Sequence, residues 1–321
     1  MTDEDAGDSY DMRFAGINMN VQTATPWFGT YVGGLVQALA GGAPLSAAHS
    51  LARQNADATV TLQPGTPEFQ QLFNQIISNP DLTQGAKFVD NTKIYHMDGN
   101  YNFAGDVDFA DIMIGGSWRQ YSLNSDGTIF TDPIDGTIDY NEYGAYTQVV
   151  KKFADDRLKF TGSLRYDKAE NFDGNFSPRI SLSYSLGQGK TRNLRASYQT
   201  GFRNPTTQDL YIGLDAGQAH LVGSAPNNLD RYTTPDLPIS PTGQALGFGA
   251  STALSGRLAY ENAFSLTSVL SGAPEMTSFE YVQPEKVQAF EVGYRAGFGS
   301  FSLDASFYFN NYEDFIGNKT V

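Results

Sequence analysis

The sequence predicts an all-β protein, and more narrowly an antiparallel, up-and-down transmembrane β-barrel segment of about eight or nine strands. Three observations lead to this fold class. Apolar and polar residues alternate in runs of roughly 9–12 residues, the length that a tilted strand needs to cross a bilayer, whereas strands of soluble proteins usually have about 5–6. The connections between the runs alternate between short and long. Aromatic residues lie towards the ends of the runs, where a membrane interface would be.

The composition is consistent with this class. The chain of 321 residues contains 18 Tyr, 22 Phe and 33 Gly, a mixture typical of β-rich proteins. Its net charge of −14 argues against nucleic-acid binding, and the absence of cysteine excludes disulfides and thiolate metal sites. No apolar run reaches the roughly 20 residues of a spanning helix, and the acidic start lacks the features of a signal peptide. Taken alone, that start would indicate a cytosolic chain.

The N-terminal quarter is predicted to be mainly a long loop that carries helices. One strand is possible near Asp11–Val21, but residues 21–90 do not read as strands. Thr66 is a favourable N-cap residue and Pro67 suits the first helical position, so a helix is expected to begin there. A shorter helix is expected near Ser46–Asn55. These helices either pack down and hold the loop in place or form a lid over a ligand entrance.

The strands are predicted from residue 93 onwards, each buried on one face only. The clear alternations occupy 158–166, 179–186, 194–203 and 301–310, and the weaker ones occupy 93–104, 111–122, 138–152 and 286–296. One face is expected to point towards lipid and the other towards a water-filled lumen. The lipid-facing set includes Leu164, Leu182, Tyr198 and Phe307, and the lumen-facing set includes Arg165, Arg179, Arg195 and Asp304.

The connections predict which strand ends lie together. In an up-and-down meander alternate connections lie on opposite rims, so the short turns should share the periplasmic rim and the long loops the other rim. The short turns are 154–157, 187–192 and 297–300, and the long loops are 123–137, 171–176 and 204–283. So few strands would make only a narrow barrel, whereas the inward positions are polar and the loops large. The sheet is therefore expected to be open, with two unpaired edges, one of them at 301–315.

Several segments resemble the β-barrel of TonB-dependent outer-membrane receptors. The segment "YQTGFRNPTTQDLY" (198–211) is similar to the strand-exit motif of that family, with Asn204 where alanine is commoner. The segments "PEKVQAFEVGYR" (284–295) and "FYFNNYEDFI" (307–316) resemble the two strands that follow the long loop. Further segments resemble the version found in Bacteroidetes-type receptors: "NEYGAYTQVVKKFADDRLKFTGSLRYDK" (141–168), "FSPRISLSYS" (176–185) and "GAKFVDNTKIYHMDGNYNF" (85–103). The resemblance covers about 85–321 and keeps the order and spacing of the motifs.

This resemblance implies a 22-stranded barrel in the outer membrane of a Gram-negative bacterium, plugged from inside by an N-terminal domain. The family imports scarce ligands, namely iron chelates, cobalamin, glycans or peptides, and draws energy from the TonB–ExbB–ExbD complex through a short N-terminal box. The expected partners are therefore this complex, the receptor's own plug, outer-membrane lipid and the ligand. Since neither plug nor box is recognisable in the sequence, residues 1–321 are expected to be a fragment of the barrel domain. Its expected parts are a long loop with helices (21–90), strands (93–203), a long extracellular loop (204–283) and further strands (284–315).

Two groups of polar residues are candidates for binding. The first lies at strand exits to the long loops and is a candidate for ligand contact: Arg119, Tyr121, Arg203, Asp209 and Tyr211. Interface anchoring and loop hydrogen bonding are the alternative roles for this group. The second group projects into the expected lumen: Arg165, Arg179, Arg195, Glu291, Arg295 and Asp304. The resemblance implies that these side chains contact the plug; in an empty lumen they would instead be solvated.

No catalytic residue, metal site or cofactor is predicted. The histidines His49, His96 and His220 are far apart and have no partner at ligand spacing. The acidic stretch 124–142 lacks the twelve-residue calcium pattern and reads better as turns. The sequence also shows no phosphate loop and no nucleophile elbow. Besides an import receptor, a passive porin or adhesin barrel and a soluble β-sandwich that binds or hydrolyses glycans remain as alternatives.

Overall fold

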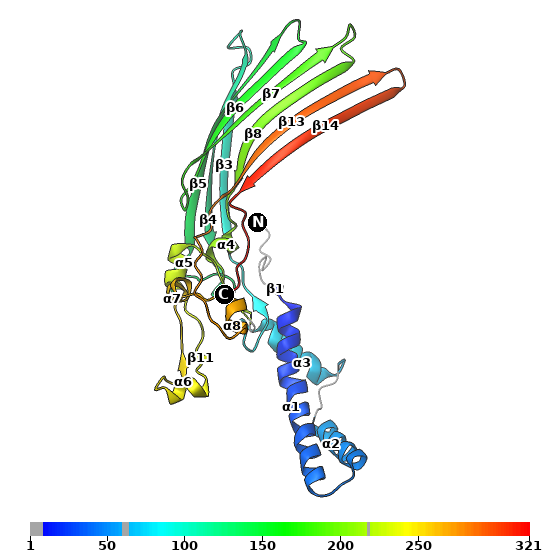
Figure 1. Ribbon diagram of the computed structural model, residues 1–321, viewed down its shortest axis with the longest axis vertical. Coiled ribbons are helices and arrows are strands. Elements are labelled where there is room, and N and C mark those ends of the chain that lie inside the picture. The colour runs from blue at the N-terminus through cyan, green and yellow to red at the C-terminus, as the bar shows by residue number, and fades with distance from the viewer. Residues whose placement is uncertain (1–8, 60–63, 217–218) are drawn as a thin grey trace. The chain divides into compact units, whose positions relative to one another are not determined.

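The computed structural model describes residues 9–59, 64–216 and 219–321 (Figure 1). The chain forms two units. The first comprises the described parts of Met1–Thr92, together with Asn124–Asp132 and Gly213–Leu221. The second comprises Lys93–Leu123, Pro133–Ile212 and Val222–Val321 and contains the main sheet.

The main sheet has eight strands in the order β14-β13-β8-β7-β6-β5-β4-β3, and every neighbouring pair is antiparallel. The chain therefore forms one meander in sequence order, as predicted, interrupted only where the long loop separates β8 from β13 (Figure 1). The strands are β3 (Lys93–Asn102), β4 (Asp111–Leu123), β5 (Ile138–Phe153), β6 (Leu158–Ala169), β7 (Asn175–Leu186), β8 (Arg192–Arg203), β13 (Glu285–Phe298) and β14 (Phe301–Glu313).

The short turns lie on one rim of the sheet and the long loops on the other, which confirms the predicted topology. The pairs Phe153↔Leu158, Leu186↔Arg192 and Phe298↔Phe301 close the three tight turns at the same ends of their strands. Tight reversal requires left-handed backbone, and the turn after β5 places three consecutive non-glycine residues, Ala154–Asp156, at positive φ. Figure 1 shows these turns together at the upper end of the sheet.

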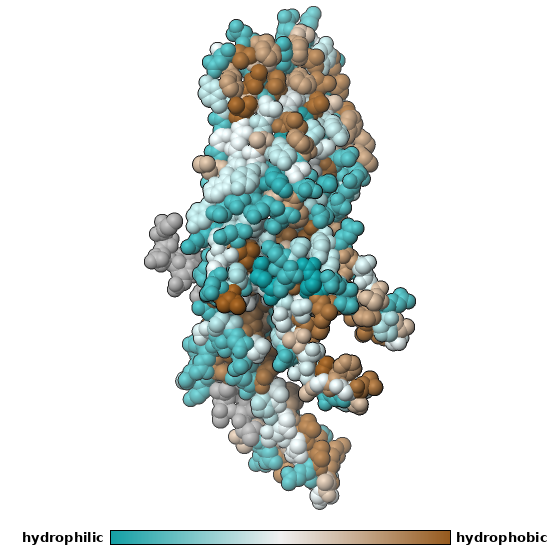
Figure 2. Space-filling view, turned by 90° about the vertical axis from the view of Figure 1, so that its left-hand side faces the viewer, coloured by the Kyte–Doolittle hydropathy of each residue, from teal (hydrophilic) through white to brown (hydrophobic). Residues whose placement is uncertain are grey.

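Cross-strand pairing separates the apolar and polar residues onto opposite faces, as their alternation predicted. Leu182 lies opposite Phe160 on β6 and Ala196 on β8, and that row continues through Val292 to Phe307. These side chains do not enter a closed core, since Leu182 is 44% exposed and Phe307 is 66% exposed. Figure 2 shows apolar side chains gathered over the turn end of the sheet, drawn uppermost. The arrangement contradicts a β-sandwich, whose apolar faces pack against each other.

The sheet is open. Strands β3 and β14 each pair with a single neighbour, and all of their residues are exposed. The predicted unpaired edges are therefore present, one of them at β14. Such edges carry free backbone N–H and C=O groups, which cannot remain unpaired in lipid.

The first unit contains three helices, α1 (Met12–Ala40), α2 (Leu45–Thr59) and α3 (Pro67–Ser78), and the short pair β1 (Ser9–Tyr10) and β2 (Lys87–Phe88). The strand predicted near Asp11–Val21 is wrong, because α1 occupies this segment. A helix forms there because four residues that recur at helical spacing are buried: Phe14, Ala15, Asn18 and Met19. All of them except Asn18 pack in a core with Ile76 and Ala86. No helix in the described part of the chain is both long enough and apolar enough to span a membrane.

The two other helices of this unit agree with the sequence. In α3 the Thr66 hydroxyl accepts a hydrogen bond from the Phe69 backbone N–H at 3.3 Å, and Pro67 takes the first helical position. Helix α2 covers the predicted segment Ser46–Asn55 and extends it at both ends.

The start of α1 gives a testable pH dependence. The Asp11 carboxylate caps the helix by accepting from the backbone N–H groups of Arg13 at 2.7 Å and Phe14 at 3.4 Å, and it binds the Arg13 guanidinium at 2.7 Å. The Arg13 side chain, ahead of these backbone bonds, lowers the pKa of Asp11 from 3.8 to about 2. Because the pKa is lower in the folded state, the cap stabilises the helix fully above about pH 4 and is lost as the pH falls through 2.

We expect a ¹³C titration of the Asp11 carboxyl to show a midpoint near 2, and Arg13→Gln to move the midpoint upward towards 3.8. A wild-type midpoint at 3.8 or higher would show that the cap is not formed.

The long loop between β8 and β13 contains short helices. They are α4 (Thr207–Tyr211), α5 (Pro226–Arg231), α6 (Pro241–Ala245), α7 (Gly256–Glu261) and α8 (Leu266–Leu270), with the short strands β9 (Gly213–Asp215), β10 (His220–Val222), β11 (Leu237–Pro238) and β12 (Ser251–Thr252). Arg257 on α7 ties three segments of the loop together. Its guanidinium donates to the Asp230 carboxylate at 2.8 Å, to the Tyr281 hydroxyl and to the Pro226 carbonyl at 3.0 Å. The hydrogen bond from Arg257 lowers the pKa of Asp230.

Candidate functional site

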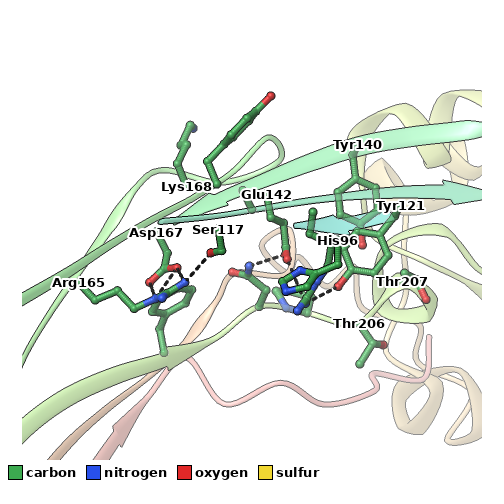
Figure 3. A pocket seen from close by; sticks show the side chains of 16 residues that line it. His96, Ser117, Tyr121, Tyr140, Glu142, Arg165, Asp167, Lys168, Thr206 and Thr207 are labelled. Atoms are coloured by element: carbon green, nitrogen blue, oxygen red, sulfur yellow. Dashed lines mark hydrogen bonds and ion pairs between the residues drawn. The ribbon is translucent and has the colours of Figure 1, made fainter. Parts of the chain in front are cut away.

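A cavity of about 520 Å³ lies on the polar face of the sheet, where β4, β5 and β6 approach the loop rim and the chain leaves β8 (Figure 3). Its lining combines charged, hydroxyl and aromatic side chains. The lining residues are His96, Ser117, Arg119, Tyr121, Tyr140, Glu142, Tyr143, Arg165, Asp167, Lys168, Ala169, Phe202, Asn204, Pro205, Thr206 and Thr207.

One cluster in the cavity centres on Glu142. The register places Glu142 directly opposite Arg119, and the Arg119 guanidinium lies 3.6 Å from its carboxylate. The same guanidinium donates to the Tyr121 hydroxyl at 3.1 Å. Asn204, just beyond β8, donates to the other oxygen of Glu142 at 3.0 Å. Glu142 therefore joins the wall of the sheet to the first residue of the long loop.

A second cluster spans three strands. The Arg165 guanidinium on β6 binds both oxygens of Asp167 at 2.8 Å and also donates to the Ser117 hydroxyl on β4 at 3.2 Å. To reach β4 it crosses Gly144 on β5, where an added Cβ would lie 2.3 Å from the guanidinium. Glycine at this position is thus required by a close approach of a side chain, not by its backbone angles. Figure 3 shows Arg165, Asp167 and Ser117 drawn together by these bonds.

Aromatic rings support the loop end of the site. Tyr121 stacks on Tyr140 with ring centres 4.6 Å apart, and Tyr140 contacts the ring of Tyr211 on α4 at 5.8 Å. Tyr211 is 1% exposed, and its hydroxyl donates to the Asn171 side chain at 3.0 Å. Burial raises the pKa of Tyr211, so the phenol is neutral at physiological pH. The stack anchors the start of the long loop to the sheet.

The five residues considered for ligand contact fall into different environments. Arg119 and Tyr121 line the cavity. Arg203 lies on the same face and pairs with Glu285 on β13 at 2.9 Å. The Asp209 carboxylate accepts from the Thr206 backbone N–H and hydroxyl at 2.8 Å and so caps α4, while Tyr211 is buried. Only the first two are placed where a ligand in the cavity would meet them; ligand contact by any of the five stays a prediction.

The six residues expected to line the lumen share the polar face. Arg195 on β8 binds Glu291 on β13 at 3.3 Å and Asp304 on β14 at 3.1 Å. The Arg195 side chain crosses Gly293, where an added Cβ would lie 2.6 Å from the guanidinium. Arg195 therefore passes over a glycine of the neighbouring strand in the same way as Arg165 does. Arg179 and Arg295 are exposed and make no ion pair within the described residues. Contact of this set with a plug stays a prediction.

Sequence reasoning missed Glu142, Asp167 and Asn204. Both acids occupy polar positions of strands whose alternation was recognised, but their partners depend on which strands are neighbours and in what register. Asn204 was noted only as a departure from a motif. Among the described residues, no group of three histidine or acidic side chains is arranged to hold a metal ion.

The fold and this site define a class of protein. An open antiparallel sheet of long strands, apolar and exposed on one face and lined with ion pairs on the other, has the architecture of an outer-membrane barrel wall. A family model described as "TonB dependent receptor-like, beta-barrel" matches residues 3–321. The chain therefore belongs to the TonB-dependent receptor family, as its motifs indicated.

Solved structures resemble the chain at low sequence identity. The siderophore receptor PirA from Pseudomonas aeruginosa is 15% identical, with a TM-score of 0.42 over 70% of this chain and 34% of that one. A mutant of the ferric enterobactin receptor PfeA from the same species is 14% identical, with a TM-score of 0.44 over 71% and 28%. The copper transporter OprC is also 14% identical, with a TM-score of 0.38 over 71% and 30%. The chain thus spans about a third of the length of these proteins. No curated protein matches it in sequence.

Proposed function

We propose that this chain is part of an outer-membrane transporter that binds a scarce ligand and imports it with energy from the TonB–ExbB–ExbD complex. The observation that carries the proposal is the family match over residues 3–321. The exposed apolar face supports a lipid-facing wall, and the ion-paired face supports a wet lumen. The ligand is an iron chelate, cobalamin, a glycan or a peptide.

In this proposal the eight strands form part of a larger barrel of the 22-stranded type. Further strands of the receptor pair with β3 and β14 and satisfy their free backbone groups. The short turns lie in the periplasm and the long loops outside the cell. The receptor's plug fills the lumen against the polar face, and the ligand meets Arg119 and Tyr121 at the loop end of the cavity.

Deletion of the complete gene tests this function. The deletion strain should lose growth on one limiting source, supplied singly as an iron chelate, cobalamin or glycan, and the intact gene should restore it. Uptake should also stop when TonB is deleted or the proton gradient is collapsed. Uptake that continues without TonB would favour a passive porin. Recovery of the receptor in a soluble fraction would favour a soluble protein that binds or hydrolyses glycans. Cleavage of an added glycan would then indicate hydrolysis, and binding without cleavage would indicate a glycan-binding protein.

A further inference from the structure

The two turns that join β5 to β6 and β7 to β8 carry an unusual excess of positive charge. Residues 151–159 and 187–192 contain six basic residues and two acidic ones, Asp155 and Asp156, a net charge of +4 in a chain whose total is −14. We call this group the cationic turn patch. It consists of Lys151, Lys152, Arg157, Lys159, Lys190 and Arg192.

Hydrogen bonds hold the two turns together as one surface. The Arg157 guanidinium in the first turn donates to the Gly187 carbonyl in the second at 2.7 Å. Lys190 in the second turn donates to the Asp155 carbonyl in the first at 2.9 Å. The charges of the patch are therefore held side by side at one rim of the sheet.

Two of the cations lie on the apolar face of the sheet. Lys151 is the cross-strand partner of Phe160, and Arg192 is the partner of Leu186. The Lys151 ammonium lies 5.2 Å from the ring centre of Phe109, and the Arg192 guanidinium lies 5.5 Å from that of Phe298. Each charge thus stands at the end of an apolar surface, over an aromatic ring.

These two cations, Lys151 and Arg192, differ from the ion-paired arginines of the polar face. Arg165, Arg195 and Arg203 each bind a carboxylate within 3.3 Å. Lys151 and Arg192 make no ion pair within the described residues, and their charged groups lie over aromatic rings. Their positive charge is therefore available to an anion from outside the chain.

We propose that the cationic turn patch binds the phosphates of anionic phospholipid head groups in the leaflet next to the turns. This inference rests on the proposed function, because it requires the apolar face to lie in a membrane. Below the two cations, that face would contact acyl chains, and aromatic rings beside cations are suited to the boundary between acyl chains and head groups. The positive charge of the patch is complementary to phosphate and attracts an anionic leaflet. A soluble acidic partner would not reach the two cations on the lipid-facing side, Lys151 and Arg192.

The test uses the full-length receptor that contains this chain, purified in a neutral detergent. Native mass spectrometry would count bound phosphatidylglycerol against bound phosphatidylethanolamine. We expect the wild type to retain phosphatidylglycerol preferentially, and Lys151→Gln with Arg192→Gln to weaken that retention by about tenfold or more. Because the attraction is partly ionic, raising the salt concentration should reduce the preference of the wild type.

The matched control is Lys93→Gln with Lys286→Gln. Both lysines lie on the same face at the opposite rim, so the same charge is removed away from the patch. This control should retain phosphatidylglycerol as the wild type does. The exchange Lys151→Arg with Arg192→Lys should also retain it, because the charges remain.

Equal retention of the two lipids by a correctly inserted wild-type receptor would overturn the inference and leave the proposed function intact. Equal loss in the patch variant and in the control would also overturn it, since net charge alone would then explain the effect. Failure of the receptor to enter the outer membrane at all would instead overturn the proposed function. Thermal unfolding without added lipid shows whether the patch variant is folded. If it is not folded, the inference is tested by the lipid preference of the wild type and of the variant Lys151→Arg with Arg192→Lys.

Discussion

Replacing Leu182 with arginine is expected to destabilise the receptor in a bilayer by up to about 2–4 kcal/mol, the cost that a cation on the lipid face reaches at the middle of the membrane. Leu182 lies in the interior of β7, with Phe160 and Ala196 beside it on the neighbouring strands. An arginine there has no carboxylate within the same row, and its neighbours on that face are apolar. Reversible unfolding of the full-length receptor in lipid vesicles would measure the effect.

The matched control is Ser181→Arg, one residue away on the opposite face. Ser181 lies between Thr161 and Ser197, in a polar row. We expect this variant to change the unfolding free energy by less than about 1 kcal/mol, because a charge on a solvated or plug-facing wall keeps polar neighbours. If the two arginines cost the same, or if the costs were reversed, the assignment of the apolar face to lipid would be wrong.

Replacing Gly144 with alanine is expected to break the bridge that Arg165 makes across β5. The new Cβ would lie 2.3 Å from the Arg165 guanidinium, 2.7 Å from the Asp167 carboxylate and 2.8 Å from the Ser117 hydroxyl. At least one of these groups must move. We expect the hydrogen bond between Arg165 and Ser117 to break first, because it is longer than the bonds between Arg165 and Asp167. Overpacking of this kind costs about 1–3 kcal/mol. Thermal unfolding of the full-length receptor in detergent would detect it.

Gly99→Ala is the control for this substitution. Gly99 is also a strand residue, on β3, and a Cβ added there would meet nothing within 4 Å. Since alanine is less flexible than glycine in the unfolded chain, this control should be neutral or slightly stabilising. In an Arg165→Ala background the penalty of Gly144→Ala should shrink, because the closest clash is gone. A full penalty in both backgrounds would show that Gly144 is required for another reason.

Alternation of side chains determined a large part of this structure from the sequence alone. The side-chain period of a strand is two residues, so Leu182 and Ser181 are assigned to opposite faces without any knowledge of their neighbours. The lengths of the connections then predicted the meander and its two rims, because an up-and-down sheet has few other ways to place them. The helix at Pro67–Ser78 was predictable for the same kind of reason, since Thr66 and Pro67 act on the adjacent backbone.

Helix α1 was not predictable in this way. Its first residues, Asp11–Val21, were interpreted as a possible strand, and a segment with a single charged residue, Arg13, lacks the charged face that normally marks an amphipathic helix. Packing of Phe14 and Met19 against residues about 60 positions later, such as Ile76, decided between helix and strand. Local propensity is weak where such contacts supply most of the free energy.

Only the tertiary structure decided the candidate site. Arg165 and Ser117 are separated by 48 residues, and Asn204 and Glu142 by 62, so their contacts exist only because specific strands are neighbours. Register adds a second requirement, since a shift of one residue between β5 and β6 would carry Gly144 away from the path of Arg165. Alternation is a local property that each strand shows by itself. The cavity depends on the register between each pair of neighbouring strands and on residues 204–207, where the long loop begins. No single segment of the sequence contains that information.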